Sequence, residues 1–312
     1  IVSSKLRPTF FTGGTSSDSL TNVINFLAAN GLRYYYYIAE AGCDAVDASL
    51  VEALATHIDS LAQPTIGLRQ RLFVGSCDTL TNTQTVTLAM NDPRVDAFWL
   101  QNSDMPPSEI AASVAAAIAL FEQPPLNAGG VNFDGFGNDA GSAPFWKIPA
   151  PLDGTAPSQV SIKSAVISGV SPIKVQAAGR TSLVKRLTTH FKNGSVNDFR
   201  ITDSGKVTIC DFFGDDLSDL LALRYPRKLV ANDPVAGQPP AGPNVVTPSQ
   251  VKNTVIELVK TYASAGLIDG PSVINSLVVQ RETSPSSRIS VRVPLFTNDP
   301  LHIFGVSVDQ VQ

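Results

Sequence analysis

The clearest pattern of apolar and polar positions lies in the last quarter of the chain, from Thr247 onward. Thr247-Pro248-Ser249-Gln250 has the form of a capping box with proline at the first helical position, which predicts the start of a helix. The apolar stripe that follows has helical spacing and consists of Val251, Val255, Leu258, Val259 and Tyr262. Two strand-like runs come next, at 288–295 and 301–308.

The run 301–308 is followed by only four more residues of the sequence. Within it, Phe304, Val306 and Val308 alternate with Gly305, Ser307 and Asp309, so one face can be buried and can fix the register. The apolar positions of the whole run are Leu301, Ile303, Phe304, Val306 and Val308. A terminal strand of this kind can complete a sheet of its own chain, or it can enter the sheet of a neighbouring subunit. We predict the second use, which makes these residues an inter-subunit strand.

Helix and strand patterns alternate through the first 125 residues. The expected helices start near Ser16, at Asp47 and at Asp104, and the expected strands cover 33–39, 72–75 and 96–100. Strands separated by helices of this length imply crossover connections and a parallel sheet. The fold class is therefore α/β, with a parallel-type sheet and flanking helices. Residues 79–90 are rich in threonine and receive no assignment.

Two domains are expected, 1–196 and 197–312. A loop-rich insert around 123–179 is interrupted by an apolar run at 166–173, and 180–191 alternates as a strand that returns to the sheet. The second part is smaller and of α+β type, with a helical pattern around Leu217–Leu223 before the capped helix.

Composition narrows the function classes. The chain has 312 residues, of which 43% are hydrophobic and 16% charged, with a formal net charge of −4. A charged fraction this low indicates a neutral polar surface or extensive burial against other subunits. The acidic balance and the absence of a basic run argue against nucleic acid as a partner.

Cysteine usage and hydropathy indicate the compartment. Cys43, Cys77 and Cys210 are far apart and odd in number, so we expect buried, reduced thiols in a reducing compartment. No signal peptide and no apolar run near 18 residues is present, so no membrane insertion is expected. Because the numbering begins at Ile1, we expect a longer protein or a processed one, with an N-terminal arm outside this sequence.

No pattern of residues predicts catalysis. His57, His190 and His302 lie on a helix or on strand-like runs without a nucleophile motif. Gly14-Thr15-Ser16 is read as a helix cap, because a serine without a positioned histidine and aspartate is a weak nucleophile. No GxSxG turn or phosphate-binding glycine loop is present.

Acidic residues offer the remaining candidate chemistry. Asp211, Asp215, Asp216 and Asp219 are the densest carboxylates, and we interpret them as a solvated first turn of a helix rather than a cation site. The pair at 134 and 139 is interpreted as turn-forming. No catalytic residue, metal or cofactor is predicted.

Several short motifs together resemble the contractile phage tail sheath family, closest to its Mu-like branch. In order along the chain they are Ala62-Gln63-Pro64-Thr65-Ile66-Gly67, Asn91-Asp92-Pro93-Arg94, Trp99-Leu100-Gln101-Asn102-Ser103-Asp104, Asn132-Phe133-Asp134-Gly135, Ser168-Gly169-Val170-Ser171-Pro172, Arg186-Leu187-Thr188-Thr189-His190, Arg224-Tyr225-Pro226-Arg227-Lys228-Leu229, Val246-Thr247-Pro248, and Glu282 with Arg288 and Val291-Arg292-Val293-Pro294. Their common order carries the resemblance across essentially the whole chain. Residues 204–213 depart from the family pattern and leave that hinge region unassigned.

The resemblance implies a subtilisin-like α/β domain without the protease residues, because a fold does not carry a function by itself. It further implies a C-terminal domain that faces the tail tube, and terminal arms that insert as strands into neighbouring subunits. The sleeve so formed contracts and drives the tube through the host envelope. The implied partners are other copies of the chain, the tail tube, the baseplate and the tail terminator. The implied location is a virion tail assembled in the bacterial host cytoplasm.

Two alternatives stay open at this stage: a cytosolic α/β enzyme whose active site has no recognisable motif, and the sheath of a non-phage contractile injection system. Lys252 and Lys260 lie on the polar face of the capped helix and are the candidates for tube-facing residues. A solvated helix face is the alternative interpretation of both lysines.

Overall fold

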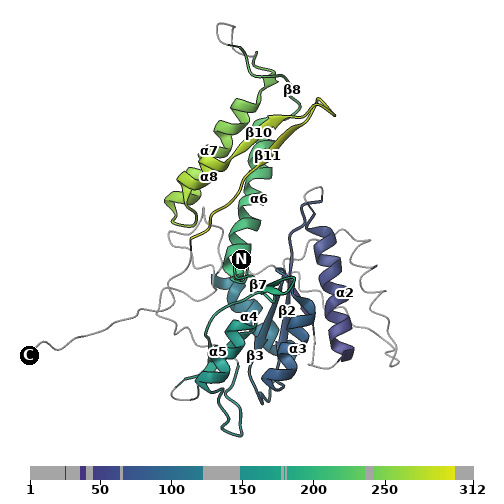
Figure 1. The fold of residues 1–312 in the computed structure, drawn as a ribbon, viewed down its shortest axis with the longest axis vertical. Helices are drawn as coiled ribbons and strands as arrows, with labels where there is room; N and C mark the ends of the chain where they lie inside the picture. Colours follow the sequence, from purple (N-terminus) through teal and green to yellow (C-terminus); the bar gives the residue numbers. More distant parts are fainter. Residues whose placement is uncertain are drawn as a thin grey trace, which may run out of the picture.

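The computed structural model describes residues 36–39, 45–63, 66–121, 148–176, 181–235 and 242–298, together with Asn25 and Gly179. These residues form two lobes (Figure 1). A sheet lobe surrounds a mixed β-sheet, and a C-terminal lobe contains helices α7 and α8 with strands β10 and β11. The long helix α6 runs from the first lobe into the second.

The sheet lobe contains the parallel sheet that the sequence predicted. Its five strands lie in the order β1-β2-β3-β4-β5; the first four are parallel and β5 is antiparallel to β4. The strands are β1 (Tyr36–Ala39), β2 (Arg71–Ser76), β3 (Val95–Trp99), β4 (Ser171–Val175) and β5 (Thr181–Leu183). Strands β2 and β3 are buried along their whole length, as near-continuous apolar strands of a covered parallel sheet should be.

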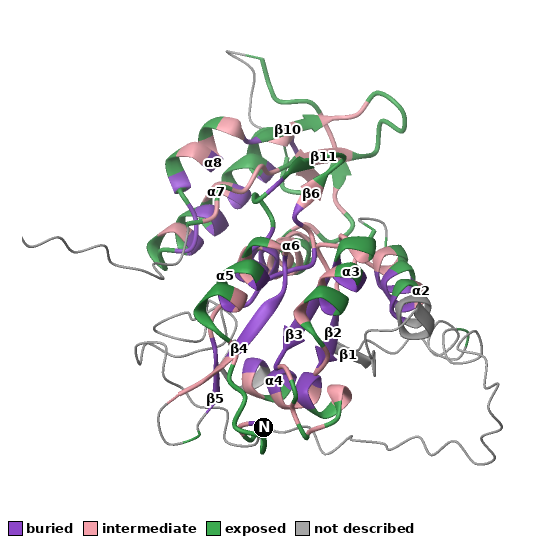
Figure 2. Cartoon of the chain, turned by 60° about the horizontal axis from the view of Figure 1, so that its bottom comes forward, coloured by how far each residue is buried: buried purple, intermediate pink, exposed green. Residues whose placement is uncertain are grey.

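Helices cover both faces of this sheet (Figure 2). They are α2 (Ala45–Leu61), α3 (Leu80–Met90), α4 (Pro107–Phe121) and α5 (Gln159–Ile167). Leu72 and Val74 of β2 pack with α2, whereas the intervening Phe73 packs with α4 on the opposite face. Because successive side chains of a strand point to opposite faces, one apolar run supplies both layers of the core.

Three segments of this lobe differ from the sequence analysis or were left unassigned by it. The threonine-rich segment without assignment is helix α3, in which the Thr83 and Thr85 hydroxyls donate to the carbonyl oxygens four residues earlier, at 3.1 and 3.0 Å. The insert around 123–179 contains a capped helix, α5, whose Ser158 side chain accepts from the Ser161 amide at 3.0 Å. Helix α2 begins at Ala45, so Asp47 lies in its first turn instead of capping it.

The C-terminal lobe has its own core around α7. Its elements are α6 (Ser204–Arg224), α7 (Pro248–Ser264), α8 (Gly270–Ser276), β10 (Val278–Arg281) and β11 (Ile289–Arg292). Two short pairs flank it along the chain: β6 (Lys192–Asn193) with β7 (Val196–Asn197), and β8 (Leu229–Val230) with β9 (Val245–Val246). The predicted start of α7 is confirmed, with the Thr247 amide donating to the Gln250 side chain at 3.2 Å. The predicted buried stripe of this helix is also confirmed.

The remaining strand predictions are confirmed only in part, and some fall outside the described residues. The expected strand at 288–295 is present but shorter, as β11, while its partner β10 and helix α8 were not predicted. Residues 180–191 form only the short strand β5 and then single bridges at Leu187 and Thr188. The inter-subunit strand at 301–308, the helix expected near Ser16, Cys43, His302 and the carboxylates at 134 and 139 lie outside the described residues.

Gly75 of β2 provides a test of how α4 is seated on the sheet. A Cβ atom at this position would lie 1.8 Å from the Pro107 carbonyl oxygen, at the first residue of α4. We expect Gly75→Ala to lower the free energy of unfolding by about 3 kcal/mol or to prevent folding, because backbone atoms must move apart. Chemical denaturation measures the change. Gly242→Ala is the control, since nothing lies within 4 Å of its Cβ; equal stability of the two variants would contradict this seating.

Candidate assembly site

Two of the three histidines, His57 and His190, lie in the part of the chain that the structure describes. His57 lies buried in α2, and this burial lowers its pKa because the charged imidazolium loses hydration. The Nδ1 atom of His190 is 3.2 Å from the Asn91 carbonyl oxygen, and its Nε2 atom is 3.9 Å from the Asp198 carboxylate. His190 thus connects the loop after α3 to the segment that follows hairpin β6–β7.

The described residues also place the other candidate groups. Cys210 is exposed on α6 and Cys77 is partly buried, so the prediction of buried thiols is wrong for these two residues; neither forms a disulfide. Within the described ranges, no three histidine, cysteine, aspartate or glutamate side chains are close enough to hold a metal ion. None of the described helices combines the length and the apolar character needed to cross a lipid bilayer.

A buried carboxylate joins three segments of the sheet lobe to the start of α6. Asp96 of β3 is fully buried, and its Oδ1 atom accepts from Arg71 at 2.5 Å. Its Oδ2 atom accepts from Arg186 Nε at 2.9 Å and from the Ser204 hydroxyl at 2.7 Å. A buried charge is tolerated only when it is paired and hydrogen-bonded, and Asp96 meets both conditions.

Two further arginines hold α6 about two and three turns beyond its start. Arg94 makes a bidentate pair with Asp211, with both nitrogen–oxygen distances at 2.9 Å, and Arg69 pairs with Asp215. The Asp216 carboxylate accepts from the Tyr262 hydroxyl of α7. The prediction of a solvated first turn at these aspartates is therefore wrong, because α6 begins earlier, at Ser204, with Asp203 as its cap. The unassigned hinge at 204–213 is the first half of this continuous helix.

These contacts form one unit, which we call the junction. It consists of Arg69, Arg71, Arg94, Asp96, Arg186, Ser204, Asp211 and Asp215. Bidentate guanidinium–carboxylate pairs fix orientation as well as distance. Helix α6 consequently leaves the sheet lobe in a defined direction and carries the C-terminal lobe with it (Figure 1).

A carboxyl group next to the junction, that of Asp92, has a perturbed pKa. Burial, and secondarily the nearby Asp59 carboxylate, raises the pKa of Asp92 to about 7. Its Oδ1 atom accepts from the Arg94 amide at 2.6 Å. Asp92 is therefore neutral in weak acid and charged in weak base, next to the arginine that grips α6.

The C-terminal lobe presents a sheet of only two strands. Strands β10 and β11 are antiparallel, with Val279 opposite Val291 and Arg281 opposite Ile289, and no other described strand pairs with either. The Glu282 amide donates to the Arg288 carbonyl oxygen at 2.9 Å. Glu282 and Arg288 are thus a hydrogen-bonded pair. Because hydrogen-bonded and non-hydrogen-bonded pairs alternate in an antiparallel ladder, Val279 and Val291 are a non-hydrogen-bonded pair. Their backbone N–H and C=O groups therefore point to the two outer edges of the sheet.

Helix α7 covers one face of this small sheet. Val279, Ile289 and Val291 pack against the buried core that α7 dominates. Two strands alone are marginal in water, and packing against a helix gives them their stability. The open edges are thus held rigidly in place, which is the arrangement that lets an extended segment add to a sheet by backbone hydrogen bonds.

The opposite face of α7 carries the two predicted tube-facing residues. Lys252 and Lys260 are both exposed. The role of the two lysines toward a tube stays a prediction.

The buried face of the same helix carries Tyr262. Burial strongly raises the pKa of Tyr262, and the hydrogen bond of its hydroxyl with Asp216 adds to this effect.

The junction was not predicted, although the sequence contains a signal for it. Arg71 and Asp96 lie within strands that are otherwise apolar and buried. Charged residues at such positions indicate a pair that is satisfied inside the protein. The partner Arg186 lies 90 residues from Asp96 in the sequence, so the pairing itself could only be seen in the fold.

No protein-family model matches this sequence, and no curated protein matches it. Solved structures do match in fold. The sheath tail protein from Desulfitobacterium hafniense aligns with a TM-score of 0.56 and 12% identity, over 92% of this chain and 62% of that chain. The sheath tail protein from Listeria innocua aligns with a TM-score of 0.61 and 13% identity, over 94% of this chain and 60% of that chain.

A sheath complex of an extracellular contractile injection system, in the contracted state, aligns with a TM-score of 0.54 and 14% identity, over 88% of this chain and 70% of that chain. At these identities the likeness is one of fold. The chain spans about three fifths of the length of the first two proteins. The described structure therefore has the mixed α/β fold found in sheath proteins of contractile tails and injection systems.

Asp92 gives the junction a testable dependence on pH. The folded protein keeps the Asp92 proton up to about pH 7, whereas the unfolded chain releases it near the ordinary aspartate pKa of 3.8. Stability from this group is therefore full below about pH 4 and is lost as the pH rises through 7. We expect Asp92→Asn to reduce the loss of unfolding free energy between pH 5 and 8 by more than about 1 kcal/mol. Denaturation at both pH values, with the exposed Asp219→Asn as control, measures it; parallel profiles for Asp92→Asn and wild type would contradict the assignment.

Proposed function

We propose that this chain is a structural subunit of a contractile tail sheath, which polymerises with copies of itself into a helical sleeve around a tail tube. The observation that carries the proposal is the two-stranded sheet β10–β11, which is held on α7 and whose outer edges pair with no other described strand. The fold likeness to sheath proteins over about nine tenths of the chain supports it.

Backbone hydrogen bonds at the open edges would link the copies. A segment from a neighbouring chain adds a strand to an exposed edge without needing a preformed pocket. The proposed donor is the strand expected at 301–308, with Leu301, Ile303, Phe304, Val306 and Val308. The alternation of its last three apolar positions with Gly305, Ser307 and Asp309 selects one face for burial. Contacts that do not close a ring propagate as a helix.

The proposed division of labour follows the two lobes. Residues 1–196, as a non-catalytic subtilisin-like domain, form the outer part, and residues 197–312 form the part next to the tube, with Lys252 and Lys260 facing it. The junction keeps α6 attached to the sheet lobe while rigid lobes of different copies re-pack. Such re-packing needs no cofactor and no catalysis, provided that the extended sleeve is metastable and stores the energy of assembly.

The proposed surroundings are those of a contractile device. The sleeve would surround a tail tube, meet a baseplate at one end and a terminator at the other, and form part of a virion tail assembled in the bacterial host cytoplasm, where contraction drives the tube through the host envelope. The likeness to an injection-system sheath favours a second candidate of the same mechanism, the sheath of a non-phage contractile injection system.

Electron microscopy of the full-length protein tests the proposal. We expect hollow, striated tubes of uniform diameter at high concentration, either from the protein alone or after addition of tail tube. Deletion of 301–312 should abolish the tubes and leave the sheet lobe folded, because the proposed linking strand is gone while the sheet core lies elsewhere. Discrete particles under both conditions would contradict the sheath, and normal tubes from the deletion variant would contradict the strand link.

Proline substitutions at the open edges test the linkage separately from the donor segment. Val279→Pro and Val291→Pro each remove one outward-pointing N–H, which an added strand would need as a donor. We expect tubes to be lost with the proline at the edge in use. The matched variants Val279→Ala and Val291→Ala lose similar packing but keep the N–H, so they should still form tubes. Tube formation by both proline variants would rule out augmentation at these edges.

A further inference from the structure

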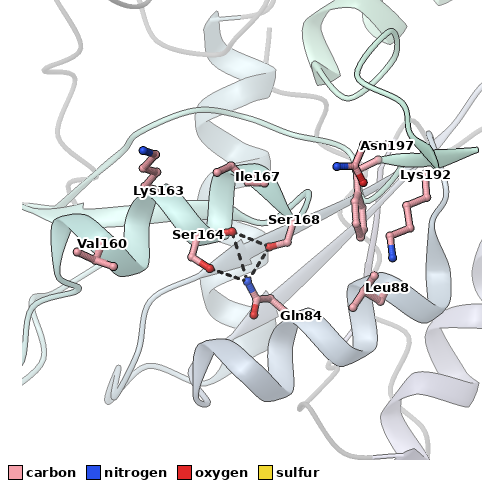
Figure 3. Close-up of a pocket in the computed structure, with 10 residues that line it drawn as sticks. Gln84, Leu88, Val160, Lys163, Ser164, Ile167, Ser168, Lys192 and Asn197 are labelled. Atoms are coloured by element: carbon pink, nitrogen blue, oxygen red, sulfur yellow. Dashed lines mark hydrogen bonds between the residues drawn. The ribbon is translucent and has the colours of Figure 1, made fainter. Parts of the chain in front are cut away.

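A groove crosses the sheet lobe between α3, α5 and hairpin β6–β7 (Figure 3). Its volume is about 500 Å³. Gln84 of α3 connects its two walls: the side-chain amide donates to the Ser168 hydroxyl at 2.9 Å and to the Ser164 hydroxyl at 3.2 Å of α5. The groove is therefore a fixed feature of two helices tied together, not a space between independent segments.

The walls of this groove are apolar and unusually exposed. Val160 is 79% exposed, Ile167 51% and Leu88 of α3 42%. Along α5 the exposed positions Val160, Lys163, Ser164 and Ile167 have the spacing of one helical stripe. Contiguous exposed apolar side chains on neighbouring elements mark an interaction surface.

The charge of the groove is positive. Lys163 and Lys192 line it, and none of its described lining residues carries a carboxylate. The Lys192 ammonium lies 5.6 Å from the centre of the Phe191 ring, which also lines the groove. A fitting occupant carries an acidic group beside an apolar side chain.

Helix α6 carries such a surface in the C-terminal lobe. Leu223 is 81% exposed, and Asp219 and Ala222 are exposed on the same helical stripe. The neighbouring Arg224 is held by the Glu257 carboxylate of α7 at 2.6 Å. Asp219, Ala222 and Leu223 form what we call the α6 patch.

We propose that the α6 patch of one copy of this chain docks into the α3–α5 groove of a second copy. The spacing supports this pairing. Asp219 and Leu223 are four residues apart on α6, and Lys163 and Ile167 are four residues apart on α5, so charge and apolar group are separated by about 6 Å along each helix. One helix in the groove between two others can then match both pairs at once.

The geometry makes this contact directional. The groove belongs to the sheet lobe and the α6 patch to the C-terminal lobe, so each copy offers two different surfaces. Contacts between unlike surfaces run head to tail and propagate unless they close a ring. The proposal rests on the proposed sheath function only in the choice of a second copy as partner, and it uses side chains that the strand link does not use.

Disulfide cross-linking of mixed variants tests the contact in the full-length protein. In a Cys210→Ser background, Ile167→Cys places a thiol in the groove and Leu223→Cys places one in the α6 patch. We expect a covalent dimer at least tenfold more abundant when the two variants are mixed and oxidised than with either variant alone. Leu229→Cys, also in the C-terminal lobe and 69% exposed, replaces Leu223→Cys as the matched control. Equal cross-linking with Leu223→Cys and Leu229→Cys would overturn the proposal.

Charge reversal gives a second, independent readout by sedimentation velocity. We expect Lys163→Glu and Asp219→Lys each to weaken self-association about tenfold, because like charges then face each other, and their combination in one chain to restore it within about threefold. Failure of the double variant to recover would overturn the pairing.

The contact and the sheath function can fail separately. Tubes that form without the specific cross-link would refute this contact and leave the sheath proposal intact. The cross-link in discrete particles that never form tubes would support the contact and refute the sheath.

Discussion

The structure depends on one buried charge. Asp96 has no access to water, and its two oxygens are satisfied by Arg71, Arg186 and Ser204, which come from three distant parts of the sequence. Asp96 is the carboxylate that both buried arginines, Arg71 and Arg186, share, so its removal would leave two buried positive charges without this partner. Loss of the opposite charge is among the most costly defects in a protein interior. The segments therefore have to assemble together. Strand β3, the segment after β5 and the start of α6 are positioned by this shared requirement as much as by apolar packing.

Helix α6 converts this local requirement into long-range order. Its first residue, Ser204, donates to Asp96, and the helix is held again by Arg94 and Arg69. It then packs in the core of the C-terminal lobe beside α7. A helix clamped at several points behaves as a stiff rod rather than as a linker. The small sheet β10–β11 is thus placed at a defined distance and orientation from the large one, although the two sheets share no hydrogen bonds.

Regular patterns were predictable from the sequence, and pairings were not. The alternation of apolar strands and amphipathic helices identified β2, β3, α4 and α7, because burial on a sheet or a helix stripe leaves a direct periodic trace. Helix α3 was missed because threonine favours strands, and here its hydroxyls bond to the helix backbone instead. The aspartates of α6 looked like a solvated turn because nothing local reveals that Arg69 and Arg94 lie opposite them. Strand β10 was missed because its four residues, Val278–Arg281, show no clear alternation of apolar and polar positions, and its strand structure depends on pairing with β11.

The outer edges of β10–β11 also bear on how large the proposed assembly becomes. A closed ring or a capped pair uses up its binding surfaces, so the subunit itself fixes the copy number. A sheet that accepts a strand on an edge offers the same unsatisfied backbone groups again on each copy that joins. The structure of such a subunit therefore does not set the number of copies. A separate component, acting as a template, would then have to set the length of the assembly.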